Sequence, residues 1–200
     1  MSATLALLRH GETPWTQDKR VQGRTDVALS DRGRAALAAR RLPTGWVLAP
    51  VASSPLTRCQ QSAAALGLQR VTVEPRLIEM DWGEWEGRRL AELRAELGAV
   101  MSDNEDRGMD FQPPQGESPR MVLERVRPWL VQCAASNAAT VAVTHRGVIR
   151  VILALATGWD MLGRPPAKLD WTALHSFTLD PEGVPLVLQL NMALPEHVFP

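Results

Sequence analysis

Short apolar runs that alternate with helically spaced segments are the main pattern of this sequence. The runs that predict strands are 4–8, 47–52, 71–73 and 140–144, with two further candidates at 172–179 and 185–191. The segments that predict helices are 31–41, 55–66, 89–97, 147–157 and one that begins at Ser118. Because strands and helices alternate, we expect an α/β fold with three layers, α/β/α. Its mainly parallel sheet should be covered on both faces and carry one antiparallel edge strand, supplied by the last pair.

Serines and prolines mark the expected ends of several helices. Ser30 is a typical N-cap, and Ser54-Pro55 and Ser118-Pro119 each place a proline at the first helical position behind a serine cap. Pro128 falls inside the helix that begins at Ser118 and should kink or break it. Residues 98–117 are rich in Gly, Asp, Asn and Pro, so we expect a loop there.

Composition is that of an ordinary globular protein, and we expect one domain over residues 1–200. A chain of 200 residues with 45% hydrophobic residues can bury a core without metals or disulfides. Its 22 basic and 22 acidic side chains cancel, which argues against nucleic-acid and polybasic membrane partners. Cys59 and Cys133 form no CxxC pattern, which favours reduced thiols in a cytoplasmic protein. The apolar N-terminus is too short for a signal peptide or a membrane span.

Histidines and arginines follow three of the predicted strands. Arg9-His10-Gly11 follows the first, Arg58 lies in the helix after the second, and His145-Arg146-Gly147 follows the strand at 140–144. Since the carboxyl ends of parallel strands meet at one edge of a sheet, we expect these groups to converge. Arginines and helix N-termini bind phosphoryl groups, and a neutral imidazole is a competent nucleophile toward phosphorus.

Phosphoryl transfer also needs a carboxyl group that protonates the leaving oxygen and then activates water. Residues 77–87 contain four acids, of which Glu79 and Asp81 are the expected inward pair; spacing leaves the choice between them open. A metal-dependent hydrolase is a weaker alternative because Arg9 and Arg58 would repel a cation. We therefore expect no metal and no cofactor.

Five blocks of sequence occur in an order that is familiar from one superfamily. The blocks are Leu7 to Thr13 with Gln22-Gly23 and Ser30 behind it, Ser54 to Arg58, Glu79 to Gly87, Gly116 to Ser118, and Thr144 to Arg150. Together they resemble the histidine phosphatase superfamily, in its phosphoglycerate mutase-like branch. The resemblance spans residues 5 to about 150. It implies the phosphoglycerate mutase-like fold and a phosphohistidine mechanism without a metal.

The resemblance also implies residue roles. His10 would be the nucleophile, and Glu79 the proton donor and then the base. The groups that bind the phosphoryl group would be Arg9, Arg58 and His145. Further substrate contacts would come from Thr16, Gln22, Gly23 and the backbone N–H of Arg146. The sequence departs from the family at Thr16, where Asn is frequent, at Ser62, where Thr is usual, and at Arg146, where Gly is frequent.

A phosphatase is favoured over a mutase, because the mutase branch generally carries a longer insertion between the donor Glu and the second His. The run from Glu79 to Gly87 is more similar to the broad phosphatase branch, which includes the enzyme acting on α-ribazole phosphate. We therefore predict a cytoplasmic phosphomonoester hydrolase for a small phosphorylated metabolite, with homodimer formation left open. The alternatives are a phosphoglycerate mutase, an α-ribazole phosphatase and a non-catalytic phosphate-binding regulatory protein.

Overall fold

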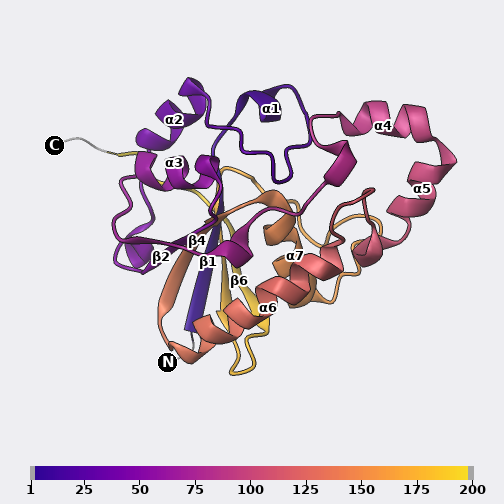
Figure 1. The fold of residues 1–200 in the computed structure, drawn as a ribbon. Coiled ribbons are helices and arrows are strands. Elements are labelled where there is room, and N and C mark those ends of the chain that lie inside the picture. The colour runs from indigo at the N-terminus through magenta and orange to yellow at the C-terminus, as the bar shows by residue number, and fades with distance from the viewer. Residues whose placement is uncertain (1–2, 198–200) are drawn as a thin grey trace.

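A single sheet organises the computed structural model, which describes residues 3–197. Within these residues six strands follow the order β3-β2-β4-β1-β5-β6 (Figure 1). The strands are β1 (Ala3–Arg9), β2 (Val51–Ser53), β3 (Val71–Val73), β4 (Ala139–Thr144), β5 (Leu174–Leu179) and β6 (Pro185–Met192). β1 to β4 are mutually parallel, whereas β5 runs antiparallel to both β1 and β6. The predicted mainly parallel sheet with an antiparallel edge from the last pair is confirmed.

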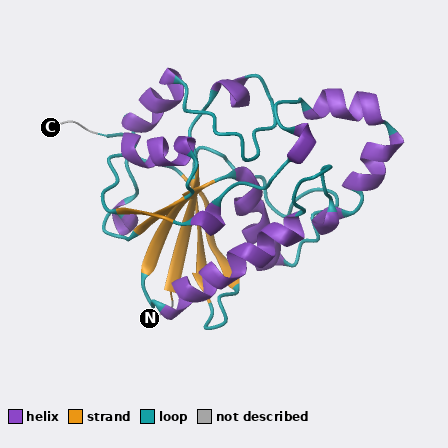
Figure 2. Ribbon diagram, viewed as in Figure 1, coloured by secondary structure: helices purple, strands orange, loops and turns teal. Residues whose placement is uncertain are grey.

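Helices cover both faces of this sheet. α6 (Pro119–Ala135) and α7 (Arg146–Thr157) lie on one side, and α2 (Asp31–Ala38) and α3 (Thr57–Ala65) lie on the other (Figures 1 and 2). β1 shows how the sequence sets up two cores. Leu5 and Leu7 pack with residues of α6 and α7, whereas Ala6 and Leu8 pack with residues of α3. Successive side chains of a strand point to opposite faces, so an unbroken apolar run is what a doubly covered strand requires.

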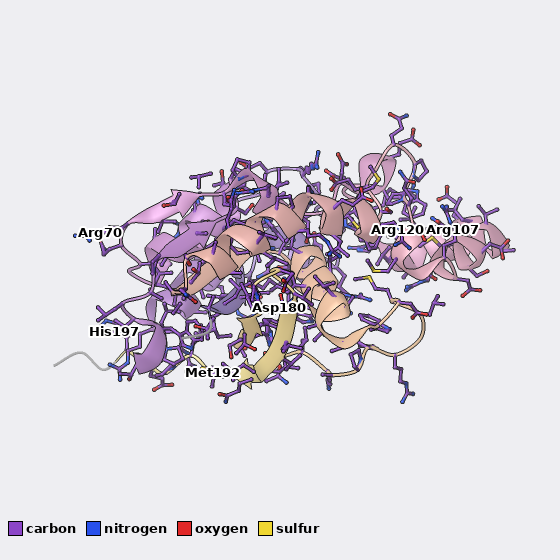
Figure 3. All side chains as sticks on the ribbon, turned by 90° about the horizontal axis from the view of Figure 1, so that it is seen from below. Arg70, Arg107, Arg120, Asp180, Met192 and His197 are labelled. Atoms are coloured by element: carbon purple, nitrogen blue, oxygen red, sulfur yellow. The ribbon has the colours of Figure 1, made fainter. Side chains whose placement is uncertain are left out.

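The segment between β3 and α6 extends away from the sheet and carries α4 (Leu90–Leu97) and α5 (Ala99–Glu105). Trp85, Leu93 and Met101 form a small separate core under these helices. Seen from below, Arg107 and Arg120 lie at this end of the molecule, and Arg70 and His197 at the opposite end (Figure 3).

The prediction of a loop over residues 98–117 is wrong in part, because α5 occupies residues 99–105 and a 3-10 turn follows at Gly108–Asp110. Within α5 only Met101 is buried. A short helix with a single inward side chain leaves no amphipathic pattern for the sequence to reveal.

The strand expected at 47–52 is shorter than predicted. β2 begins at Val51, because residues 44–50 form a 3-10 helix and a turn in which Leu48 is 96% exposed. The helix that follows begins at Thr57, so Pro55 precedes it and does not occupy its first position. An apolar run thus contains exposed turn residues here, which hydrophobicity alone does not separate from a buried strand.

Pro128 does not break α6, which runs without interruption from Pro119 to Ala135. Pro128 and Glu124 are both exposed, so water can satisfy the carbonyl that loses its helical partner. The predicted caps at the starts of α2 and α6 are confirmed. Ser30 accepts from the N–H of Gly33, and Ser118 accepts from the N–H of Met121.

Candidate active site

Three neighbouring parallel strands deliver the central residues of the site. β1, β4 and β2 end side by side; His10 follows β1, Ser54 follows β2 and His145 follows β4. The two imidazole rings lie with their centroids 5.2 Å apart. His10 is 5% exposed and His145 is fully buried. The predicted convergence of the two histidines at one edge of the sheet is confirmed.

Hydrogen bonding fixes the tautomer of His10. Its Nδ1 lies 2.7 Å from the carbonyl oxygen of Gly11, which can only accept, so Nδ1 carries the proton. Burial, together with the positive charges of Arg9 and Arg58, holds the pKa of His10 well below 6.5. The ring is therefore neutral near pH 7, and its Nε2 lone pair is free to attack an electrophile.

His145 has the opposite arrangement. Its Nε2 lies 2.7 Å from Oγ of Ser54 and 3.4 Å from Sγ of Cys59. The Ser54 oxygen accepts from the N–H of Leu56 at 3.3 Å, and its hydroxyl hydrogen is available for donation to Nε2. In the tautomer that accepts this hydrogen bond, the proton of the neutral ring resides on Nδ1, which is then a donor. Burial, followed by the charge of His10 and of the nearby arginines, holds the pKa of His145 well below its usual value.

Buried Arg58 and half-buried Arg9 supply positive charge, and neither has an ion-pair partner among residues 3–197. Arg58, in the first turn of α3, is fully buried and donates to the carbonyl oxygens of Gly23 at 2.7 Å and Thr25 at 2.9 Å. The Nε atoms of Arg58 and Arg9 are buried and have no hydrogen-bond partner among the described residues. Burial lowers the pKa of both side chains, that of Arg9 to about 10, so both remain charged at pH 7. Buried charges are normally paired, so this arrangement favours a bound anion.

A short loop places the carbonyl groups that hold Arg58. Gly23 adopts a φ of +54°, and a Cβ there would lie 1.8 Å from Oε1 of Glu86, so only glycine fits. Glu86 accepts from the N–H of Arg24 at 2.6 Å and of Thr25 at 2.8 Å. A carboxylate from the segment after β3 therefore fixes the loop that follows β1.

Thr16 and Gln22, both expected to contact substrate, form hydrogen bonds with Thr13. The Thr16 hydroxyl donates to the Thr13 carbonyl at 2.8 Å and accepts from its N–H at 2.9 Å, a capping box at α1 (Pro14–Gln17). Oε1 of Gln22 accepts from Oγ1 of Thr13 at 3.0 Å. In this structure the two side chains fix the segment after β1, and any direct contact with substrate stays a prediction.

Among the four acids of residues 77–87, Glu79 is the one that faces α7. Both of its carboxylate oxygens accept from the N–H of Gly147, at 3.1 and 3.2 Å. A Cβ on Gly147 would lie 2.4 Å from Glu79 Oε1, so glycine permits this approach. Asp81 instead accepts from the N–H of Gly83 and pairs with Arg24. The structure thus separates the two carboxylates that the sequence left as alternatives.

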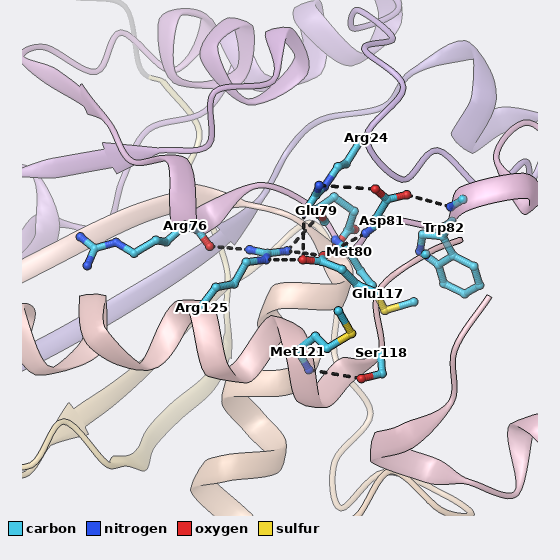
Figure 4. A network of polar contacts seen from close by, with 12 residues as sticks. Arg24, Arg76, Glu79, Met80, Asp81, Trp82, Glu117, Ser118, Met121 and Arg125 are labelled. Atoms are coloured by element: carbon cyan, nitrogen blue, oxygen red, sulfur yellow. Dashed lines mark hydrogen bonds and ion pairs between the residues drawn. The ribbon is translucent and has the colours of Figure 1, made fainter. Parts of the chain in front are cut away.

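Arg125 of α6 holds the main chain on which Glu79 lies (Figure 4). It donates to the carbonyl oxygens of Arg76 at 2.6 Å and of Glu79 at 3.1 Å. The same guanidinium pairs with Glu117 at 3.0 Å, and Glu117 also pairs with Arg24 at 2.8 Å. Glu79 is therefore positioned by a network that reaches from α6 to the loop after β1.

Arg146 is exposed at the first position of α7, and its guanidinium carbon lies 5.1 Å from the ring centroid of Trp171. Within residues 3–197, no group of three or more His, Cys, Asp or Glu side chains is placed to hold a metal ion. None of the helices described is both long enough and apolar enough to cross a membrane. Cys59 and Cys133 are buried free thiols.

Comparison with known proteins agrees with this geometry. A sequence model of the histidine phosphatase superfamily (branch 1) matches residues 5–192. The chain belongs to the histidine phosphatase superfamily. A glucosyl-3-phosphoglycerate phosphatase of Mycolicibacterium vanbaalenii is 33% identical over 87% of this chain and 84% of its own length. A corresponding enzyme of Mycobacterium tuberculosis is 32% identical over 85% and 84% of the two chains.

Solved structures extend the likeness to the fold. A mycobacterial glucosyl-3-phosphoglycerate phosphatase superposes with a TM-score of 0.74 at 27% identity, covering 96% of this chain and all of that one. An α-ribazole phosphatase of Shigella flexneri gives a TM-score of 0.77 at 24% identity, covering 96% and 98%. The expected phosphoglycerate mutase-like fold of this histidine phosphatase is confirmed.

Several residues of the site had no predicted part in its chemistry; Ser54 was expected only as a helix cap, a role it does not have. Ser54, Glu86 and Glu117 lie inside blocks that resemble the superfamily. The sequence therefore indicated that they lie near the site, but it did not indicate which groups they contact. Arg125 had no such signal, because an arginine on the polar side of an amphipathic helix is indistinguishable from a solvated one. Trp171 lies beyond the last block.

Proposed function

We propose that this histidine phosphatase hydrolyses phosphate monoesters of small metabolites through a covalent phosphohistidine on His10, with no metal ion. The observation that carries the proposal is a neutral imidazole with a free Nε2 near two arginines, Arg9 and Arg58, whose buried Nε atoms have no hydrogen-bond partner in the described chain. A phosphoryl group offers several oxygens to such a site. The named relatives, which are phosphatases, support a small phosphorylated substrate.

In the first step, Nε2 of His10 forms a bond to phosphorus while the bond to the ester oxygen breaks. Arg9 and Arg58 neutralise the oxygens of the transferred group, and Nδ1–H of His145 donates to the charge that develops on them. Glu79, protonated at this stage, gives its proton to the leaving oxygen, so that a neutral alcohol departs.

In the second step, a water oxygen attacks phosphorus and the bond to His10 Nε2 breaks. The Glu79 carboxylate takes a proton from that water, which restores the starting protonation state and releases inorganic phosphate. The buried position of Glu79, 8% exposed, suits a carboxyl group that exchanges one proton with each reacting oxygen in turn.

Hydrolysis of p-nitrophenyl phosphate in the presence of EDTA tests this proposal. We expect wild-type turnover and loss of turnover in His10→Ala. In Glu79→Gln we expect rapid phosphorylation, because p-nitrophenolate can leave without a proton, followed by slow release of phosphate, because no base activates the water. His197→Gln, which removes an exposed histidine that follows the last strand, is the matched control. Wild-type activity that survives in His10→Ala, or that EDTA abolishes, would refute the mechanism.

The fate of the phosphoryl group separates a hydrolase from a mutase. Phosphorylated enzyme that decays with release of inorganic phosphate supports the hydrolase, whereas transfer to an added alcohol without release supports a mutase. Two properties stay predictions: a cytoplasmic location, which the buried free thiols support, and a single domain, with homodimer formation left open.

A further inference from the structure

The contacts of Arg9 differ from those of Arg24, Arg76 and Arg125, each of which pairs with an acid. The side chain of Arg9 is half-buried, its Nε has no hydrogen-bond partner, and no acid among residues 3–197 pairs with it. Its guanidinium carbon lies 5.8 Å from the ring centroid of Trp171, within the range of a cation–π contact. Because an arginine side chain has several rotatable bonds, this aromatic face is what orients the guanidinium.

The charge of Arg9 acts directly on the reacting groups. Arg9 precedes His10 in the chain, and its charge, after burial, is the next cause that holds the pKa of His10 below its usual value. The carboxylate of Glu79 and the charge of Arg58 act in turn on the pKa of Arg9. The guanidinium of Arg9 therefore lies among the nucleophile, the proton donor and the second arginine of the proposed mechanism.

The loop that carries Trp171 is fixed on both sides of the indole. Oδ1 of Asn191, in β6, accepts from the N–H of Asp170 at 2.7 Å, and its Nδ2 donates to the carbonyl oxygen of Lys168 at 2.9 Å. The Asp170 carboxylate accepts from the N–H of Thr172 at 2.9 Å and from its hydroxyl at 2.8 Å, an Asx turn around Trp171. A ring on such a loop has a defined position before any ligand binds.

Two guanidinium groups lie against this ring, and their environments differ. The guanidinium carbon of Arg146 is 5.1 Å from the ring centroid of Trp171, but the Arg146 side chain is exposed. Burial lowers the pKa of Arg9 to about 10, which reflects its loss of contact with water. Since a cation–π contact is stronger when the cation is desolvated, Trp171 should stabilise Arg9 more than Arg146.

An aromatic partner has an advantage over an acid at this position. A carboxylate would neutralise the guanidinium and compete with a phosphoryl group for its donors, whereas a ring occupies the face and leaves the donors on the edge available. Arg58 follows the same rule, because the carbonyl oxygens of Gly23 and Thr25 hold it. Both arginines assigned to the phosphoryl group are thus held by uncharged partners.

We propose that Trp171 is a positioning residue of the active site, whose indole face holds the guanidinium of Arg9 in place before the phosphoryl group arrives. Binding then needs no further ordering of that side chain, which strengthens the binding of the anion. The inference rests on the proposed function and deepens it, because it adds a residue from the segment between α7 and β5 to the phosphoryl site.

Binding of inorganic phosphate, followed by phosphorus NMR, tests the inference. Trp171→Leu removes the aromatic face but keeps an apolar side chain, and it should raise the Kd for phosphate about threefold to tenfold. Trp171→Phe provides an aromatic face again and should recover most of the affinity. Trp159→Leu is the matched control. It removes a ring whose centroid lies 5.1 Å from the guanidinium carbon of Arg150, and it should leave the Kd unchanged.

A double-mutant cycle separates positioning of Arg9 from a purely structural role. In an Arg9→Gln background, Trp171→Leu should change the Kd by less than about twofold, because the group that Trp171 orients is absent. In an Arg146→Gln background it should keep its full effect. An equal loss in all backgrounds, or a loss that disappears only with Arg146→Gln, would overturn the inference. Trp171→Met, which also lacks an aromatic face, is carried through the same cycle and replaces Trp171→Leu if that variant does not fold.

Turnover of p-nitrophenyl phosphate reports the proposed function separately. Trp171→Leu should raise its KM more than it lowers kcat, because Arg9 contacts the phosphoryl group before as well as during transfer. Normal turnover by the wild type together with an unchanged phosphate Kd in Trp171→Leu would overturn the inference and leave the phosphatase function intact. Phosphate binding without turnover would refute the proposed function, and the cycle would still decide the role of Trp171. A wild type that binds no phosphate would overturn the inference.

Discussion

The two neutral imidazoles at the centre of the site should make the protein less stable as the pH falls below 6.5. In the folded chain His10 and His145 stay unprotonated, because burial and neighbouring positive charge hold the pKa of each well below its usual value. In the unfolded chain each takes up a proton near pH 6.5. The unfolded state therefore binds more protons below this pH, and the free energy of unfolding decreases with acidification.

The size of the effect follows from titration of the unfolded state. A histidine that never protonates in the folded state loses up to about 1.4 kcal/mol of stabilisation between pH 7.5 and pH 5.5. His10 and His145 together then account for up to about 2.7 kcal/mol on the same reasoning. That is a large share of the roughly 5–15 kcal/mol by which a domain is stable, so it is measurable.

Urea unfolding at pH 7.5, 6.5 and 5.5 measures this dependence. The comparison is between the wild type and the double variant His10→Gln/His145→Gln, with His197→Gln as the control for loss of a histidine elsewhere. The double variant should lose about 2.7 kcal/mol less than the wild type over the two pH units. Equal losses in wild type and double variant would show that the two imidazoles are protonated in the folded protein, and would refute the reasoning.

Three further predictions concern the loop that holds Arg58, the second histidine and the ligand. Gly23→Ala should destabilise the fold by at least about 1–2 kcal/mol, measured as a lower Tm, because the added Cβ is strained at positive φ and collides with Glu86. Gly67→Ala is the control for backbone strain alone, because Gly67 also has a positive φ but a Cβ there would meet no neighbour. A similar Tm for both variants would exclude the collision. Ser54→Ala should lower kcat about fivefold to tenfold, as loss of one neutral hydrogen bond predicts, by freeing the tautomer of His145; an unchanged kcat would mean that Ser54 does not orient the ring. Inorganic phosphate at ten times its Kd should raise the free energy of unfolding by about 1.4 kcal/mol, and the absence of such a rise would contradict an anion site in the folded protein.

The parts of the fold that the sequence predicted are those in which one periodicity dominates. β1 is apolar on both faces because helices cover both, and α7 carries a continuous apolar face that ends at a glycine. The site was predictable for a related reason. Parallel strands bring their carboxyl ends together whatever their separation along the chain. The residues that directly follow three of these strands in the sequence were therefore expected to meet.

The parts that the sequence did not predict depend on packing between distant segments. Leu48 is apolar but exposed in a turn, and Pro128 lies on a solvent-exposed face of an uninterrupted helix. The roles of Arg125 and Trp171 depend on which main-chain carbonyl or which guanidinium lies opposite each of them. Neither neighbour is close in sequence, so no local pattern could have assigned these contacts.

The position of β1 in the sheet has a consequence for synthesis on the ribosome. β1 is the first strand to be made, yet its two neighbours are β4 and β5, which begin at Ala139 and Leu174. Most of the chain must be translated before this largely apolar strand finds either partner. Until then the nascent chain exposes an unpaired hydrophobic strand of the kind that promotes aggregation and chaperone binding. The same delay applies to assembly of the active site. His10 is synthesised early, but it lies beside His145 only after β4 has paired with β1.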